Sequence, residues 1–412
     1  MKELVIIGGG ASGMAAAIRA SEEENTRVTL LERQARAGRK LAATGNGRCN
    51  LTNLGEEVHN YQGEDPGFAN AALTEYPPER VLAFFRGLGL RTVTEYGGRV
   101  YPLSDHAGSV LDVLRLGLEK RNVSLLTAAP VTGIRREPTR FRIETPEGAL
   151  TADSVILACG GCAGSRLGGV MDGYALAASL GHSRTALYPA LTQLRTAPEY
   201  PRALKGIRVD ARVRLLQGER ALAETAGDVL FTDTGLSGTA VFEITRAAAG
   251  KSGLTAELCL FDEPEETLLA DLLARQKRWP NLEANRILTG AAQSRLGQML
   301  CRYAGVSGGL RAGELPESQL RGLAQAMRAM RLPVTGVSGF ETAQVTAGGV
   351  RTAEFDPETL RSRLVPGLYA CGEVLDVDGA CGGYNLSWAW KSGMVAGAAA
   401  ARRARRLART AR

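Results

Sequence analysis

Three glycines near the start of the chain are spaced to bind the phosphates of a dinucleotide. The strand-like residues 2–7 run into G-x-G-x-x-G at Gly8, Gly10 and Gly13, and a small-residue helix is predicted over residues 14–20. The first glycine permits a tight turn, the second lets the backbone approach a pyrophosphate, and the third lets the helix pack close to the strand. The helix N-terminus offers unpaired N–H groups and a partial positive charge to the phosphates. We therefore predict a dinucleotide site in residues 8–13, which we name the glycine loop.

An acidic residue extends this pattern. A second strand, predicted over residues 27–31, ends in Glu32, nineteen residues after Gly13. An acid at about this distance accepts hydrogen bonds from an adenosine ribose. The alternative is a glycine-rich turn beside an ordinary exposed glutamate. We favour the binding site because the strand, the spacing and the acid agree.

Two further segments are rich in small or amide side chains. Residues 44–53, with the sequence TGNGRCNLTN, are typical of a loop around a large polar ligand, although asparagine and glycine also favour surface turns. The strand predicted over residues 154–158 runs into small residues, which let the chain pass close under a cofactor. We assign Ala158 and Gly160 to the cofactor site, with Ala11 at the start of the first helix.

The C-terminal part of the chain supplies a second acidic strand end. We expect a strand to end at Gly372–Glu373, where the acid can bind a polyhydroxy ribityl chain. A glycine pair then starts a helix at about Tyr384, and a helix N-terminus here would stabilise negative charge on the N1/C2 side of a reduced flavin. Since NAD has no ribityl chain, this pattern favours FAD.

These segments must be positioned by more than one domain, because 412 residues are too many for a single compact core. Residues 1–183 and 339–412 read as the two parts of a split cofactor domain. Between them we expect an insertion with a β-rich part over residues 184–262 and a helical part over residues 263–338. Helical spacing also predicts helices over 78–88, 108–120 and 172–181.

The composition limits the class of protein. A hydrophobic content of 44% with 23% charged residues is typical of a soluble globular protein. We expect no membrane span, no signal peptide and, with seven scattered cysteines, a reduced cytoplasmic location. His59, His106 and His182 show no metal-ligand spacing, so no metal is expected. The net charge of +7 allows a polyanionic partner, but a general excess of arginine explains it as well.

With these motifs in place, the chain resembles the HI0933-like, or BaiN-type, family of FAD-dependent oxidoreductases. The loop TGNGRCNLTN and the block GEVLDVDGACGGYN (residues 372–385) carry the resemblance, which extends over nearly the whole chain. It implies an α/β fold: a glutathione-reductase-type FAD-binding Rossmann fold, split in sequence, with an inserted β-barrel-like and helical domain. The chain departs from the family's commonest pattern at His106, where many members carry lysine, and at Asp233, where many carry histidine. Both positions lie outside the motifs that bind FAD.

The resemblance also implies which residues contact FAD. They are Gly8, Gly10, Ser12, Gly13, Glu32, Arg33, Lys40, Asn46, Gly47, Asn50, Gly372, Glu373, Gly383 and Asn385, while Val131 binds the adenine through its backbone. To these we add Tyr384, at the start of the helix on the flavin side.

Several side chains are candidates for chemistry. Tyr384, Cys49 or a water molecule could donate a proton to the substrate. Cys159 and Cys162 form a C-x-x-C pair, but a thioredoxin-like context is missing and we favour a packing role for Cys159.

We expect reduced FAD to deliver hydride from N5 to an electron-poor C=C bond, with NADPH or NADH as a transient donor. Since no second G-x-G-x-x-G is present, the nicotinamide should visit the substrate cavity in a ping-pong cycle. The resemblance implies enone reduction on steroid-like molecules, and we favour reduction of C=C bonds in general. Reduction of uridine to dihydrouridine in ribosomal RNA is the named alternative, which would suit a basic face formed by Arg275, Lys277, Arg278, Arg286 and Arg295. An amine oxidase and a non-catalytic, flavin-loaded RNA-binding protein remain as further alternatives. The sequence carries no signal for an oligomeric state.

Overall fold

The computed structural model describes residues 1–306 and 308–410, with residues 403–410 described by their backbone alone. These residues form two compact units. One consists of residues 1–188 together with the chain from Gln344 onward, and the other of Pro189–Ala343. The first unit is therefore discontinuous in sequence, and the second is inserted into it.

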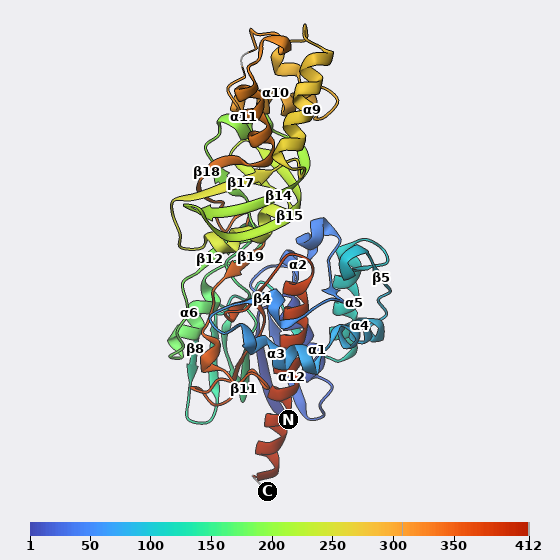
Figure 1. Cartoon of the computed structure of the whole chain (residues 1–412). Coiled ribbons are helices and arrows are strands. Elements are labelled where there is room, and N and C mark those ends of the chain that lie inside the picture. The colour runs from blue at the N-terminus through green and yellow to red at the C-terminus, as the bar shows by residue number, and fades with distance from the viewer. Residues whose placement is uncertain (307, 411–412) are drawn as a thin grey trace. The chain divides into compact units, whose positions relative to one another are not determined.

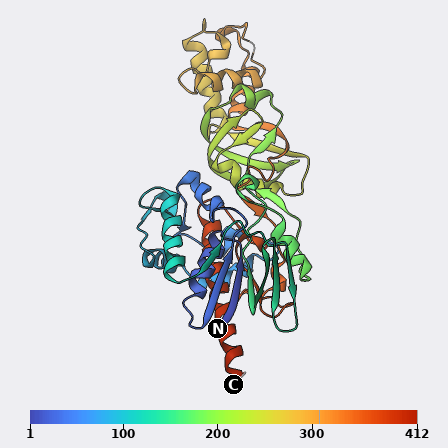
Figure 2. The ribbon, with the colours of Figure 1, turned by 180° about the vertical axis from the view of Figure 1, so that it is seen from behind.

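A parallel sheet of five strands forms the centre of the first unit. The strands are β1 (Lys2–Ile7), β2 (Thr26–Leu31), β7 (Ser124–Leu126), β11 (Ser154–Leu157) and β20 (Leu368–Ala370), in the order β20-β11-β1-β2-β7. The strand order reverses between β1 and β11, and ligands of such sheets lie at the carboxyl ends of the strands at this point. Figure 2 shows this sheet beside a second, antiparallel sheet of β8 (Gly133–Arg136), β9 (Phe141–Thr145) and β10 (Gly148–Ala152). The predicted Rossmann fold is confirmed.

Two helices cross closely beside the central sheet. Helix α1 (Ala11–Ala20) packs against α12 (Tyr384–Thr410), labelled in Figure 1. A Cβ atom on Gly393 would lie 2.3 Å from Ser12 O, and one on Gly397 would lie 2.3 Å from Ala16 O. Small residues therefore let the two backbones touch, which brings the last helix of the chain against the first.

The remaining elements of the first unit are short except for two helices. Helices α4 (Pro78–Gly87) and α5 (Ala107–Lys120) lie where the sequence predicted them. The shorter elements are α2 (Arg39–Ala43), β3 (Thr52–Asn53), β4 (Tyr61–Gln62), α3 (Asn70–Glu75), β5 (Thr92–Thr94), β6 (Arg99–Pro102), α6 (Asp172–Ser179), β19 (Val345–Ala347) and β21 (Asp378–Gly379).

The second unit is a closed barrel with helices at one end (Figure 1). Its strands, in barrel order, are β13 (Leu194–Thr196), β16 (Gly235–Ser237), β15 (Arg220–Thr232), β14 (Arg208–Gln217), β17 (Leu254–Cys259) and β18 (Met330–Val337). The helices are α9 (Glu265–Arg278), α10 (Ser294–Tyr303) and α11 (Glu317–Arg328), while α7 (Glu199–Ala203) and α8 (Thr239–Thr245) follow strands. Strand β12 (Tyr188–Ala190) lies at the entry to this unit.

One barrel strand lies in the segment 263–338, which we expected to be helical. Met330 and Leu332 are buried while Arg331 and Pro333 are exposed, so residues 330–333 alternate as a strand does. This alternating run is short and directly follows a long helical segment rich in leucine, alanine and arginine. The change from helical spacing to the alternation of a strand was therefore missed in the sequence.

A buried histidine lies where the chain leaves the first unit. His182 Nδ1 is 2.6 Å from Glu354 Oε2, and His182 Nε2 is 2.9 Å from Ser362 Oγ. Burial lowers the pKa of His182, against the effect of the Glu354 carboxylate. Burial opposes the ionisation of Glu354, but hydrogen bonds from Ser183 and His182 outweigh it and lower the pKa of this carboxyl. The cluster therefore favours a neutral histidine beside an ionised glutamate.

We expect acid to destabilise the protein through this cluster. Because the folded pKa of His182 lies below its ordinary value near 6.5, the unfolded chain binds more protons below that pH, and the free energy of unfolding falls as pH falls. The melting temperature, measured from pH 7.5 to pH 5.5, should decline less steeply in His182→Asn than in the wild type. His59→Asn, at an exposed histidine, should keep the wild-type slope. Equal slopes in all three proteins would contradict this assignment.

Candidate cofactor and active site

The glycine loop connects β1 to α1 at the point where the strand order reverses. Gly8 has φ +114°, and a Cβ atom there would lie 2.3 Å from Ala158 O. A Cβ atom on Gly13 would lie 1.8 Å from Gly8 O, whereas one on Gly10 would meet no atom within 4 Å. The first and third glycines are thus required by the protein's own backbone. The second faces open space at the N-terminus of α1, which suits a phosphate group.

Glu32 is fixed beside this loop. Its side chain is buried at the end of β2, where Oε2 accepts a hydrogen bond from Gly9 N (2.9 Å) and Oε1 accepts one from Gln34 N (2.7 Å). Each carboxylate oxygen retains a further lone pair for a ligand hydroxyl. Backbone hydrogen bonds from Ala128 N and Ala129 N to the segment 32–34 hold the start of the loop that leads to the half-buried Val131.

Replacement of Glu32 by alanine is expected to weaken FAD binding by about 10- to 100-fold, because hydrogen bonds to a charged group contribute about 1.5–3 kcal/mol. The dissociation constant can be measured by quenching of flavin fluorescence. Glu24→Ala, at an exposed position after α1, is the matched control and should bind FAD as the wild type does. Unchanged FAD affinity in Glu32→Ala would count against the ribose contact.

A second group of predicted residues meets at the carboxyl ends of β11 and β20. Glu373 Oε2 lies 2.7 Å from Lys40 Nζ, and Glu373 Oε1 accepts a hydrogen bond from Thr346 N (2.8 Å). A Cβ atom on Gly372 would lie 2.5 Å from Ser12 Oγ, so this residue and α1 also touch. Segments more than 300 residues apart in sequence thus meet here. The buried Ala158 and Gly160, which has φ +70°, follow the end of β11.

The end of β20 differs from the expectation. The strand ends at Ala370, and Gly372–Val374 form a 3-10 turn. Gly372 has φ +76°, a left-handed conformation that interrupts the extended backbone before Glu373. The acid therefore lies just beyond the strand rather than at its last position.

The loop of residues 44–53 has an unusual backbone. Gly45, Asn46 and Gly47 all have positive φ, as does Cys49 with φ +63°. Asn46 is exposed, whereas Asn50 is buried and its Oδ1 accepts no hydrogen bond from the residues that the structure describes. A buried acceptor without a partner is unfavourable. This atom therefore fits a polar cofactor that donates a hydrogen bond here.

The start of α12 adjoins this loop. A Cβ atom on Gly383 would lie 2.8 Å from Asn50 Oδ1, so glycine is required at this approach. Asn385 uses its side chain within the protein, because Oδ1 accepts from Gly379 N (2.8 Å) and Nδ2 donates to Gly379 O (2.7 Å). A cofactor contact from Asn385 is thus left to its backbone N–H, which belongs to the unpaired first turn of the helix.

The two candidate proton donors differ in accessibility. Cys49 is fully buried, and burial raises the pKa of its thiol to about 12. Tyr384 is half-buried in the first turn of α12, with its ring edge-on to that of Tyr61 at 6.3 Å between centroids.

The C-x-x-C cysteines and His106 were further candidates from the sequence. Cys159 and Cys162 are free thiols, and burial raises the pKa of both, for Cys159 to about 12. Neither is therefore a ready thiolate. His106 caps the N-terminus of α5, where its Nδ1 accepts a hydrogen bond from Gly108 N (3.0 Å).

Arg33, which was expected to contact FAD, forms an ion pair with Asp172 (3.1 Å).

Sequence reasoning missed Thr346, whose N–H donates a hydrogen bond to Glu373 and whose hydroxyl accepts one from Ala163 N (2.9 Å). It also missed a buried cluster in which Glu56 contacts both Tyr61 and Lys391, the latter on α12. Lys391 had a signal, because it is the one charged residue between positions 384 and 401.

Within residues 1–306 and 308–410, no three or more side chains of the metal-binding types come together. None of the helices in the same residues is both long and apolar enough to cross a membrane.

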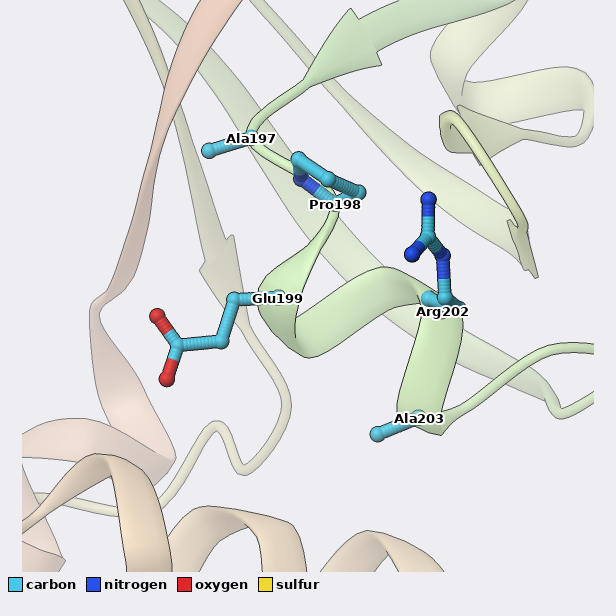
Figure 3. A pocket seen from close by; sticks show the side chains of 5 residues that line it. All are labelled: Ala197, Pro198, Glu199, Arg202 and Ala203. Carbon is cyan, nitrogen blue, oxygen red and sulfur yellow. The ribbon is translucent and has the colours of Figure 1, made fainter.

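A hollow of about 430 Å³ lies in the second unit against α7 (Figure 3). Its lining residues are Ala197, Pro198, Glu199, Arg202 and Ala203. Glu199 pairs with Arg302 on α10 (3.0 Å). The hollow thus holds none of the residues predicted to bind the cofactor.

Comparisons with known proteins agree with this geometry. The family model of the HI0933-like protein Rossmann domain matches residues 2–399. The chain is 40% identical over 417 residues to the 3-dehydro-bile acid delta(4,6)-reductase of Clostridium scindens, covering 98% of this chain and 100% of that protein. It is 30% identical to the ribosomal RNA dihydrouridine synthase of Escherichia coli, covering 95% and 96%. A solved 3-ketosteroid delta1-dehydrogenase from Sterolibacterium denitrificans aligns over 98% of this chain and 100% of that one, at 13% identity and a TM-score of 0.52. The similarity to this dehydrogenase shows the fold alone.

Proposed function

This chain belongs to the HI0933-like family of FAD-binding flavoproteins, and from this premise we propose that it is an NAD(P)H-driven reductase of electron-poor C=C bonds. The full-length identity of 40% to a delta(4,6)-reductase carries the proposal. The activity suits a cytoplasmic location, where NAD(P)H is available.

The residues at the carboxyl ends of the sheet fit FAD. Gly10 and the N-terminus of α1 would receive the pyrophosphate, and Glu32 the adenosine ribose. Glu373 would bind the ribityl chain, and the first turn of α12 would face the pyrimidine side of the flavin ring. When bound, FAD supplies the hydride chemistry that side chains lack.

The protein's own part in the reaction is to orient the substrate, exclude water and supply a proton. We assign the proton to the hydroxyl of Tyr384, because this side chain is accessible at the flavin end of α12 while the thiol of Cys49 is enclosed. The proton would go to the carbon next to the one that accepts hydride.

A small steroid-like enone is our preferred substrate. The identity to the bile acid reductase exceeds that to the RNA-modifying relative, 40% against 30%. Of the basic residues considered for RNA, Arg275 is paired with a carboxylate, that of Asp271 (2.6 Å).

The test is anaerobic absorbance spectroscopy of the yellow protein. Addition of NADPH, or of NADH, should bleach the flavin band, and a 3-dehydro bile acid with delta(4,6) double bonds should then restore it. Restoration by ribosomal RNA alone would favour the RNA alternative, and restoration by oxygen alone an oxidase. Firmly bound FAD that neither nucleotide bleaches would contradict the proposal. A stable complex of NADPH, FAD protein and enone together would exclude the ping-pong order.

A further inference from the structure

A buried ion pair lies behind the flavin end of α12. Lys391 Nζ contacts Glu56 Oε2, and the exposed fractions of the two side chains are 0% and 1%. The hydroxyl of Tyr61, itself 1% exposed, contacts the other oxygen of Glu56. Burial lowers the pKa of Lys391, while the charge of Glu56 opposes this effect. The first unit thus encloses two charged side chains and a phenol. None of the three has a role in the mechanism described above.

The cluster is connected to the first turn of α12. Tyr384, Ser387 and Lys391 are spaced by three and four residues, so they share one face of the helix. The Tyr61 hydroxyl lies 3.0 Å from Tyr384 O as well as beside Glu56. Ser387 Oγ is 2.8 Å from Thr52 Oγ1. From Tyr384 to Lys391 the helix rises by roughly 10 Å, at about 1.5 Å per residue.

Stability alone does not account for this pair. Apolar residues of similar size often replace a buried ion pair without loss of stability, whereas removal of one partner leaves an unpaired buried charge. A unit charge about 12 Å from a second charge, at an effective dielectric constant of about 20, changes the equilibrium that creates the second charge by about tenfold. The pair is therefore near enough to influence chemistry at the helix end.

We propose that Lys391 and Glu56 balance each other electrostatically at the N-terminus of α12, so that each partner cancels the effect of the other on the reduction potential of FAD. This inference rests on the proposed function, which places the flavin at that helix end. Reduction by hydride brings two electrons and one proton, so the cofactor gains one negative charge. Lys391 stabilises that charge and Glu56 opposes it, and in the intact pair the two effects nearly cancel. Among the residues that the structure describes, Glu79 on α4 also acts on the charge of Lys391.

Opposite changes of potential are therefore expected from the two partners. Glu56→Gln should raise the midpoint potential and Lys391→Met should lower it. Each should change the equilibrium constant of reduction by about tenfold, which corresponds to about 30 mV for two electrons. The double variant should return close to the wild type. Because an unpaired buried group tends to neutralise, the Glu56→Gln shift should be largest at acid pH and the Lys391→Met shift at alkaline pH.

The potentials are measured on FAD-loaded proteins by reduction against a reference dye, from pH 6 to pH 8.5. Lys391→Arg, which keeps the charge, should retain the wild-type potential even if its melting temperature falls. Arg27→Met is the matched control, because Arg27 pairs with Glu3 at the amino ends of β1 and β2 (3.1 Å), at the opposite edge of the sheet.

Shifts of the same sign in both single variants, or none in either, would overturn the inference. If one of the single variants does not fold, the double variant and Lys391→Arg provide the test. A midpoint potential that differs from the wild-type value in both of these proteins would contradict the inference. Failure of the proposed function is a separate result, since it would appear as a wild-type protein that does not bind FAD or is not reduced.

Discussion

Gly10→Ala is expected to fold as stably as the wild type and yet bind FAD about 10- to 100-fold more weakly, whereas Gly13→Ala should lose both stability and cofactor. The two glycines differ in what surrounds them. A methyl group on Gly13 would lie 1.8 Å from Gly8 O, so that β1 and α1 must separate. One on Gly10 meets no protein atom within 4 Å, and the backbone there (φ −82°) suits any residue. Its only obstruction is the ligand.

The measurement is thermal unfolding of the flavin-free proteins together with titration of FAD. We expect Gly13→Ala to be destabilised by about 3 kcal/mol or more, and Gly10→Ala to melt with the wild type. Gly322→Ala, in helix α11 with no atom within 4 Å of the new methyl group, controls for the general effect of a glycine-to-alanine change. Wild-type FAD affinity in Gly10→Ala would show that the phosphates lie elsewhere.

Tyr384→Phe is expected to slow reoxidation of the reduced flavin by an enone by about 10²- to 10⁴-fold, the range that general acid catalysis contributes. Reduction by NADPH needs no proton from this side chain and should keep its wild-type rate. Stopped-flow absorbance separates the two half-reactions.

Cys49→Ala tests the other donor. Its thiol, with a pKa raised to about 12 by burial, is enclosed, so we expect both half-reactions at near wild-type rates. A large loss confined to reoxidation in Cys49→Ala, with none in Tyr384→Phe, would exchange the two roles. Tyr96→Phe, at a fully exposed tyrosine, is the control for loss of a phenol.

The sequence predicts best where local pattern and chemistry coincide. The glycine loop, with a strand before it and Glu32 after the next strand, occupies consecutive elements, and its geometry follows from residues less than 35 positions apart. The start of α12 at Tyr384 was also predicted, because a glycine pair precedes a long run of small and apolar residues.

Contacts between distant segments could not be predicted in the same way. Lys40 meets Glu373 and Glu56 meets Lys391 across more than 300 residues, and no periodicity links such positions. Glu56 stands beside Glu57 in a polar loop, which is typical of an exposed site, yet the fold buries its side chain. The alternation of buried and exposed residues in β18 was not recognised in the sequence, because the strand directly follows a helical segment.

The discontinuity of the first unit also governs the order in which the chain can fold during synthesis. The inserted unit is continuous over residues 189–343, so all its strands are available while the ribosome is still adding residues. Helix α1 must wait for α12, and β11 for β20, across separations that slow folding. Until then the face of α1 that packs against α12 is uncovered, although α1 already meets β1, β2 and α5. The proposed FAD site includes Glu373 and the first turn of α12, so it is incomplete until these residues have been synthesised.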